Sequence, residues 1–138
     1  MDDMHFPTGR PTVVLAEDHP NVAKAIEGLL REEFDVIGVV GNGIALVSLV
    51  EILRPDAVVT DIGMPGMDGI EAARRLARSH PHMPVVFVSC HDDLGIARMA
   101  LEIGCGYVVK ASAGEDLLDA VHAVLRGDSY VSCSLRHV

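Results

Sequence analysis

Short apolar runs alternate along the chain with longer stretches of helical periodicity. The runs are rich in Val, Ile and Leu, which is typical of strands buried on both faces. They occupy residues 12–16, 36–40, 57–60, 85–88 and 107–109. After each run, apolar residues recur three and four positions apart, as on one face of a helix, within residues 22–30, 46–53, 70–77, 96–103 and 117–125. Five strand–helix units in succession predict an α/β fold with a parallel sheet, helices on both faces and right-handed crossovers.

The two ends of the chain do not follow this pattern. Residues 1–11 mix Pro, Gly and charge without periodicity, so we expect a flexible N-terminal arm. The length of 138 residues suits one domain with its own core, which we place at residues 12–126. Residues 127–138 are expected to form a tail or the start of a linker. Before the last helix, Ser112 and Glu115 have the spacing of a capping box.

Composition and charge restrict the partners of this chain. Hydrophobic residues make up 49% of the sequence and aromatic residues only 4%, so the core must be mainly aliphatic. The formal net charge of −9 repels both nucleic acid and anionic lipid, and we expect this chain to contact neither DNA nor a membrane. Cys90, Cys105 and Cys133 have no C-x-x-C spacing, which fits neither a disulfide framework nor a zinc site. Without a signal peptide at the start, these features favour a cytoplasmic protein.

Polar side chains follow four of the predicted strands directly. Glu17 and Asp18 come after the first strand, Asp61 after the third, Ser89 after the fourth and Lys110 after the fifth. In open parallel sheets, ligands bind beyond the carboxyl ends of the strands, where the strand order reverses. We therefore expect these five side chains to converge at one edge of the sheet.

Such a cluster of carboxylates predicts a metal and a reaction. Three carboxylates repel one another unless a cation lies among them, and oxygen ligands without His or Cys favour Mg²⁺. One carboxylate could then attack a phosphoryl group in line, while the metal and Lys110 neutralise the equatorial oxygens and Ser89 supplies a further donor. Taken singly, Glu17 or Asp18 would more often be a loop residue on a solvated rim. Ser89 alone would more often be a helix cap or strand-end hydroxyl, and Lys110 alone a solvent-facing charge. The occurrence of all these residues together favours a functional site over such separate roles.

Four motifs at the ends of predicted strands resemble those of a known family. They are V-V-L-A-E-D-H at 13–19, V-V-T-D-I-G-M-P-G-M-D-G at 58–69, V-F-V-S at 86–89 and G-Y-V-V-K at 106–110. The sequence resembles, over residues 12 to about 131, the receiver domains of two-component response regulators, and among them the NarL/FixJ-like subgroup. The resemblance implies a flavodoxin-like (CheY-like) doubly wound sheet of five parallel strands in the order 2-1-3-4-5, with five helices.

The resemblance also implies a role for each site residue. Asp61 would be the phosphoacceptor, with Lys110 pairing the phosphoryl group. The metal ligands would be Asp18, Asp61 and the backbone carbonyl of Gly63, with Glu17 acting largely through water. Ser89 would be the switch hydroxyl and Tyr107 the switch aromatic, which turns in from solvent on phosphorylation.

Two positions depart from the family pattern. Ala111 stands where many receivers have Pro, so a cis peptide cannot be assumed there. Cys90 follows the switch hydroxyl, where Ala is common, and its bulk bears on access to the phosphoryl group.

Two rival functions fit the residues less well. A haloacid-dehalogenase-like phosphatase needs a second Asp two residues after its nucleophile, where this chain has Gly63. A flavodoxin-type flavin carrier must bind a phosphate at its first loop, where Glu17 and Asp18 would repel one. We therefore expect a regulatory phosphoacceptor and not a turnover enzyme.

The output of such a receiver is open at this stage. A partner histidine kinase would supply the phosphoryl group. Residues 126–132 are similar to the segment that leads, in NarL/FixJ-like regulators, toward a helix-turn-helix domain. This favours the receiver part of a DNA-binding transcriptional regulator, in which phosphorylation promotes pairing of receivers or releases the DNA-binding domain. The alternative is a stand-alone receiver that docks to a protein partner.

Overall fold

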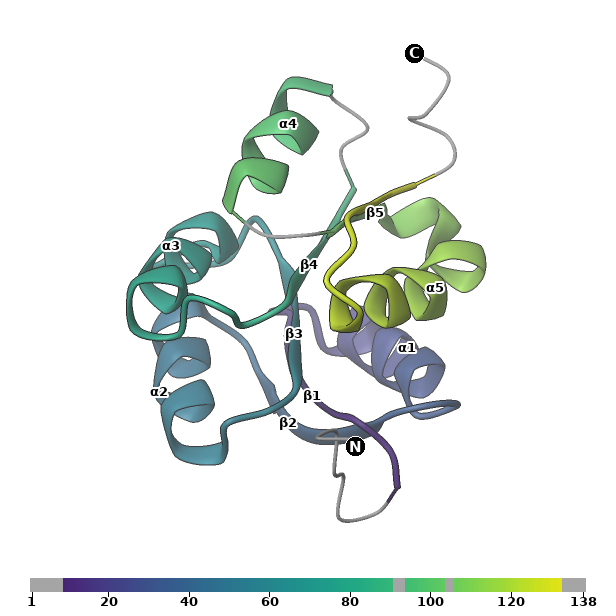
Figure 1. The fold of residues 1–138 in the computed structure, drawn as a ribbon, viewed down its shortest axis with the longest axis horizontal. Helices are drawn as coiled ribbons and strands as arrows, with labels where there is room; N and C mark the ends of the chain where they lie inside the picture. Colours follow the sequence, from purple (N-terminus) through teal and green to yellow (C-terminus); the bar gives the residue numbers. More distant parts are fainter. Residues whose placement is uncertain (1–8, 91–93, 104–105, 133–138) are drawn as a thin grey trace.

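Six parallel strands form a single sheet covered by helices on both faces (Figure 1). The computed structural model describes residues 9–90, 94–103 and 106–132. Most of the expected N-terminal arm, the last six residues of the expected tail, and Cys105 lie outside these ranges. The strands are β1 (Thr12–Ala16), β2 (Asp35–Val40), β3 (Ala57–Asp61), β4 (Val85–Ser89), β5 (Gly106–Val109) and β6 (Tyr130–Val131). The helices are α1 (Pro20–Leu30), α2 (Gly43–Leu53), α3 (Gly69–Ser79), α4 (Leu94–Ile103) and α5 (Ala113–Leu125), with a short 3-10 helix, η1 (Lys110–Ser112).

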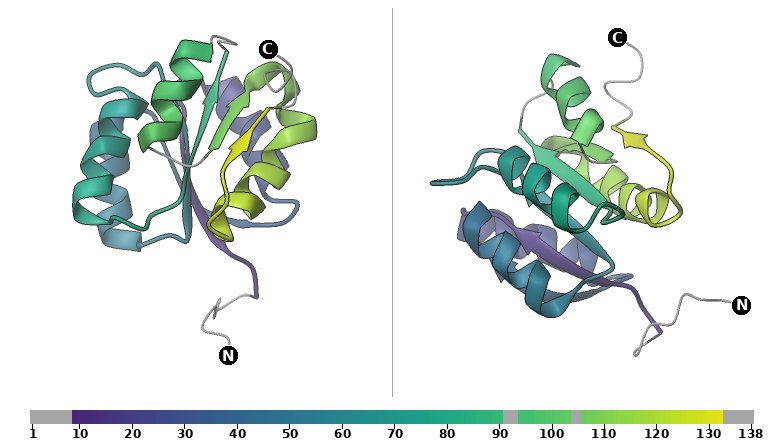
Figure 2. Two further views of the ribbon diagram at one scale, coloured as in Figure 1. Left: turned by 45° about the horizontal axis from the view of Figure 1, so that its top comes forward. Right: turned by 60° about the vertical axis from the view of Figure 1, so that its left-hand side comes forward.

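The sheet divides the core into two layers. Helices α1 and α5 cover one face, whereas α2, α3 and α4 cover the other (Figures 1 and 2). Along β1, Val13 and Leu15 pack toward α1 and α5, and Val14 and Ala16 pack toward the opposite helices. Because side chains alternate across a strand, a strand covered on both faces must be apolar throughout, and this explains the continuous apolar runs.

The expected order of the first five strands is confirmed, but the expected total of five is wrong. The observed order is β2-β1-β3-β4-β5-β6, with β6 parallel to β5. Gly127 makes the extra strand possible, because its backbone adopts a positive φ of 89° and reverses the chain after α5. Its N–H donates to the Val124 carbonyl, and the Asp128 N–H donates to the Ala123 carbonyl, which is the Schellman arrangement. A strand of two residues is too short for periodicity to reveal.

The helix starts are fixed mostly by residues recognisable in the sequence. Pro20 occupies the first turn of α1. Asn42 caps α2 by accepting a hydrogen bond of 2.8 Å from the Ala45 N–H. Asp68 caps α3 in the same way, with a hydrogen bond of 2.8 Å from the Glu71 N–H. The capping box expected at Ser112 is wrong. Its hydroxyl donates to Asp116 at 2.8 Å and makes no cap hydrogen bond with the backbone of α5.

The topology places one edge of the sheet in a position to bind ligands. From β1 the chain moves outward to β2, and then crosses to the other side of β1 to form β3. The strand order therefore reverses between β1 and β3, and open parallel sheets bind ligands beyond the carboxyl ends of the strands at such a position. In the described ranges, none of the helices has the length and apolar character needed to cross a membrane.

Candidate functional site

The registers of β1, β3, β4 and β5 bring the predicted site residues to the same edge. Ala16 pairs with Thr60, so that Glu17 and Asp61 follow side by side. Asp61 pairs with Val88, directly before Ser89, and Ser89 pairs with Val109, directly before Lys110. The strands end together because their buried apolar runs end together.

Lys110 connects two carboxylates from different strands. Its Nζ lies 2.8 Å from Glu17 Oε1 and 3.2 Å from Asp61 Oδ2. The Glu17 side chain is completely buried, and the Asp61 side chain is only 9% exposed. A buried carboxylate requires a cation or donor beside it, and Lys110 serves both.

The balance of burial and charge differs between the two carboxylates. Burial alone would raise the pKa of Glu17, but the Lys110 ammonium and the His19 N–H outweigh it, and the pKa lies below its ordinary value. Burial also raises the pKa of Asp61, where Lys110 opposes the shift only in part and the Glu17 charge adds to it. The pKa of Lys110 is raised, because Glu17 and Asp61 outweigh the effect of its own burial. Asp61 is therefore the carboxylate that most lacks a compensating charge.

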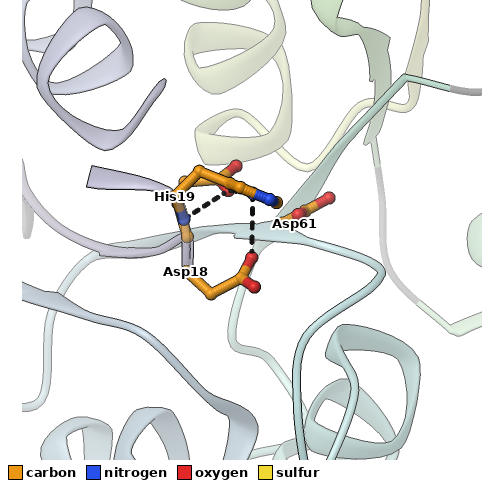
Figure 3. Close-up of side chains that lie close together, drawn as sticks. Asp18, His19 and Asp61 are labelled. Carbon is orange, nitrogen blue, oxygen red and sulfur yellow. Dashed lines mark hydrogen bonds and ion pairs between the residues drawn. The ribbon is translucent and has the colours of Figure 1, made fainter. Parts of the chain in front are cut away.

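His19 belongs to the same cluster, although it was not among the site residues predicted from the sequence. Its Nδ1 lies 3.0 Å from Glu17 Oε2. The same nitrogen lies 3.2 Å from Asp18 Oδ1 (Figure 3). These two carboxylates raise the pKa of the His19 imidazole. Its position directly after two clustered carboxylates was the available signal.

The cluster fits a divalent cation. One ligand atom from each of Glu17, Asp18, His19 and Asp61 lies within 4.8 Å of the others. Two buried carboxylate oxygens, Glu17 Oε1 and Asp18 Oδ1, accept no well-directed hydrogen bond in the described ranges, although Lys110 and His19 lie close to them. Oxygens with such unused acceptor capacity are suited to a hard cation and its waters. Gly63 is exposed two residues after Asp61.

Ser89 and Tyr107 lie beside the cluster in the interior. Ser89 is 1% exposed and Tyr107 is completely buried. Tyr107 packs in the same core cluster as Ala97 and Ala100 of α4. The expectation that Tyr107 starts in solvent is therefore wrong for this structure, because the small alanines of α4 leave room for the ring over the sheet.

The two departures from the family pattern are exposed. Cys90 is a free cysteine on the surface after β4, and Ala111 lies on the surface in η1. All peptide bonds in the described ranges are trans. An apolar depression of about 470 Å³ adjoins Lys110 between α1 and η1, lined by Val22, Ala25 and Leu29.

Comparisons with known proteins agree with this geometry. The family model described as "Response regulator receiver domain" matches residues 13–122. The transcriptional activator protein ExaE of Pseudomonas putida is 35% identical over 122 residues, which cover 86% of this chain and 57% of ExaE. The nitrate/nitrite response regulator protein NarL of Escherichia coli is 35% identical over 132 residues, which cover 92% of this chain and 60% of NarL.

A solved structure shows the same similarity in three dimensions. A two-component response regulator of the LuxR family from Aurantimonas superposes with a TM-score of 0.88 at 27% identity, covering 94% of each chain. The chain thus spans less than two thirds of the curated relatives named above, and nearly all of the chain in this solved structure. The strand order of the present chain and its carboxylate cluster at the ends of the strands agree with these matches. The chain belongs to the family of response regulator receiver domains.

Proposed function

We propose that this chain is a phosphorylation-dependent switch that accepts a phosphoryl group on Asp61 with Mg²⁺ bound beside it. The observation that carries the proposal is the position of Asp61: a buried carboxylate at the strand edge, 3.2 Å from Lys110 and within a cluster of ligand atoms. Membership of the receiver family supports the same reaction.

The chain's own residues divide the work of phosphoryl transfer. Asp61 Oδ1 accepts a hydrogen bond of 2.8 Å from the Ile62 N–H, which leaves Oδ2 beside Lys110. In the transfer, a carboxylate oxygen of Asp61 forms the new bond to phosphorus. The bond from phosphorus to the donor breaks, and the donor leaves with that electron pair. During the transfer, the Lys110 ammonium can pair with a phosphoryl oxygen in place of Asp61, while it stays near Glu17.

Asp18, Asp61 and the Gly63 carbonyl would hold Mg²⁺, with Glu17 acting through water. When bound, Mg²⁺ supplies positive charge that offsets the repulsion between the carboxylates and the phosphoryl oxygens. This assignment follows the burial of the side chains. Asp18 is 25% exposed, whereas Glu17 has no exposure and already pairs with Lys110.

Ser89 and Tyr107 would transmit the change to the surface around α4, β5 and α5. Both side chains are buried before phosphorylation, so this conformation already holds Tyr107 inward. Phosphorylation would then stabilise an existing arrangement, with the Ser89 hydroxyl drawn to a phosphoryl oxygen.

A histidine kinase would be the phosphodonor in the cell, and the cytoplasm the compartment. The apolar depression is lined in part by Lys110, whose ammonium lies 3.2 Å from Asp61, and would offer a protein donor a surface there. The output would be transcriptional, through a DNA-binding domain outside this chain and with pairing of receivers, because the relative ExaE carries the name of a transcriptional activator. The alternative is a stand-alone receiver that docks to a protein partner. The chain would turn over no external substrate.

Incubating the chain with acetyl phosphate and Mg²⁺ tests the proposal. We expect the intact mass to rise by one phosphate, and the rise to be absent from Asp61→Asn because the acceptor oxygen is lost. Asp68→Asn is the matched control, since Asp68 is an exposed carboxylate whose replacement still caps α3. Phosphate uptake by Asp61→Asn at the wild-type level would refute the proposal.

A further inference from the structure

Residues 127–132, here called the strap, return the chain from the end of α5 to the edge of the phosphoacceptor cluster. Figure 2 shows the strap in yellow beside β5. Its strand β6 runs parallel to β5, with Tyr130 opposite Gly106 and Val131 opposite Tyr107. Ser132 follows β6 and is completely buried. Because β6 runs parallel to β5, the chain that follows β6 continues toward the carboxyl end of β5, which lies directly before Lys110.

The strap holds the first end of the turn that carries Lys110. The Ser132 N–H donates to the Tyr107 carbonyl at 3.0 Å, and the Ser132 hydroxyl oxygen accepts a hydrogen bond of 2.8 Å from the Val109 N–H. Val109 is the residue before Lys110 and precedes η1. Ser132 therefore fixes the backbone from which the Lys110 side chain extends.

A second set of contacts holds the other end of the same turn. Asp116 of α5 is 3% exposed, and its carboxylate accepts hydrogen bonds from the Tyr130 hydroxyl at 2.7 Å and from the Ser112 hydroxyl at 2.8 Å. Ser112 is the last residue of η1. The carboxylate thus connects the strap to the turn, and its burial makes these donors necessary.

The sequence of the turn gives it little stiffness of its own. Ala111 is exposed and has no ring to restrict its backbone. The Lys110 ammonium lies at the end of a flexible stem, yet it must stay within hydrogen-bond distance of Glu17 and Asp61. Small displacements of a group that orients reactants slow a reaction strongly.

We propose that Ser132, together with Tyr130 and Asp116, positions Lys110 for phosphoryl transfer to Asp61. The inference rests on the proposed function and adds to it that the segment after α5 is part of the machinery of the site. The residues of the strap touch neither the phosphoryl group nor the metal. They act through the backbone of Val109 and the turn Lys110–Ser112.

The test compares phosphorylation rates of the full chain with acetyl phosphate over a range of Mg²⁺ concentrations. We expect Ser132→Ala to lower the maximal rate about fivefold, the factor that corresponds to one hydrogen bond. The half-saturating Mg²⁺ concentration should stay unchanged, because the metal ligands are untouched. General damage to the fold would change both quantities. Ser129→Ala is the matched control, an exposed serine of the same segment, and should react at the wild-type rate.

A double-mutant cycle decides whether the effect passes through Lys110. In a Lys110→Ala background, Ser132→Ala should slow the reaction no further. An equal slowing in both backgrounds, or none in the wild-type background, would overturn the inference. If Ser132→Ala does not fold, Tyr130→Phe, which removes a single hydroxyl, takes its place in the same cycle with Lys110→Ala. A wild-type chain that takes up no phosphate would overturn the proposed function and this inference together, whereas a phosphorylated wild type with an equally fast Ser132→Ala would overturn the inference alone.

Discussion

The charged side chains at the carboxyl ends of the strands differ in their exposure to water. We expect this difference to give them different roles in metal binding. Glu17 is fully buried and held by Lys110 and His19, whereas Asp18 keeps 25% of its side chain exposed. The pairing with the Lys110 ammonium leaves Glu17 less available to a hydrated cation than Asp18, whose side chain is partly exposed. We therefore expect Asp18 to be the better direct ligand.

Replacement of Asp18 should therefore weaken Mg²⁺ binding more than replacement of Glu17. We expect Asp18→Ala to lose most of the binding, since it removes a direct ligand. Glu17→Ala should cost on the order of tenfold, as is usual for groups that act through an intervening contact. Calorimetric titration of both variants with MgCl₂ measures the two dissociation constants. If Glu17→Ala is the more damaging change, the two roles are reversed.

Ionised Asp61 should destabilise the fold when no metal is bound. Its pKa in the folded chain lies above the ordinary value of 3.8, chiefly because of burial. The folded state then binds the proton more tightly than the unfolded chain, so stability falls as the pH rises from 3.8 through the folded pKa. Without Mg²⁺, Asp61→Asn should be more stable than wild type at pH 7, and the difference should shrink as the pH falls through this range.

Urea unfolding at several pH values measures this difference, and Glu17→Gln provides a control of opposite sign. Glu17 has a lowered pKa, so its contribution to stability is present above the ordinary value of 4.5 and is lost as the pH falls through the folded pKa. Glu17→Gln should therefore be less stable than wild type at pH 7. An Asp61→Asn variant that is also less stable at pH 7 would contradict the sign derived for Asp61.

At the scale of elements, the start of α3 packs directly on the end of β3. The Gly69 N–H donates to the Ile62 carbonyl at 2.8 Å, and a Cβ at Gly69 would overlap the Asp61 carbonyl oxygen. Gly69 is thus required by the close approach of helix and strand, and the approach fixes the backbone of Asp61.

Gly69→Ala should destabilise the chain by about 1–3 kcal/mol, the usual cost of overpacking, and should slow phosphorylation of Asp61. Gly28→Ala is the matched control. It lies exposed within α1 with nothing near a new Cβ, and should stabilise the chain by about 0.5–1 kcal/mol. Thermal unfolding measures both changes. A Gly69→Ala variant as stable as wild type would show that the strand and helix can separate at little cost.

The strands could be predicted to within about one residue because burial on both faces demands uninterrupted apolar runs. The site residues followed from the ends of those runs. The buried face of α4 is harder to predict, because the large Met99 is 39% exposed whereas the small Ala97 is only 2% exposed. Periodicity ranks residues by hydrophobicity, whereas here the volume of Tyr107 decides which residues can lie against it. The strap escaped prediction for a related reason, since its contacts depend on single hydroxyl groups.

At the scale of the whole molecule, the net negative charge disfavours binding to nucleic acid. Acidic residues number 20 against 11 basic ones, so the average field repels phosphate. We expect no binding to duplex DNA tighter than about 10⁻⁴ M at physiological salt, the weak limit of ordinary non-specific binding. Fluorescence anisotropy with a labelled duplex at several salt concentrations measures this. Micromolar binding that weakens with salt would show a basic surface that the composition does not suggest.

The pairing of β5 with β6 also determines which part of the molecule can be followed by ultraviolet fluorescence. The chain has two Tyr and no Trp, and the two Tyr lie on these adjacent strands, at Tyr107 and Tyr130. One ring is fully buried, and the hydroxyl of the other donates to a carboxylate, which quenches phenol emission. Ultraviolet fluorescence excited beyond the Phe band therefore comes from a single edge of the sheet. The unlabelled chain carries its own optical probe of the backbone next to Lys110.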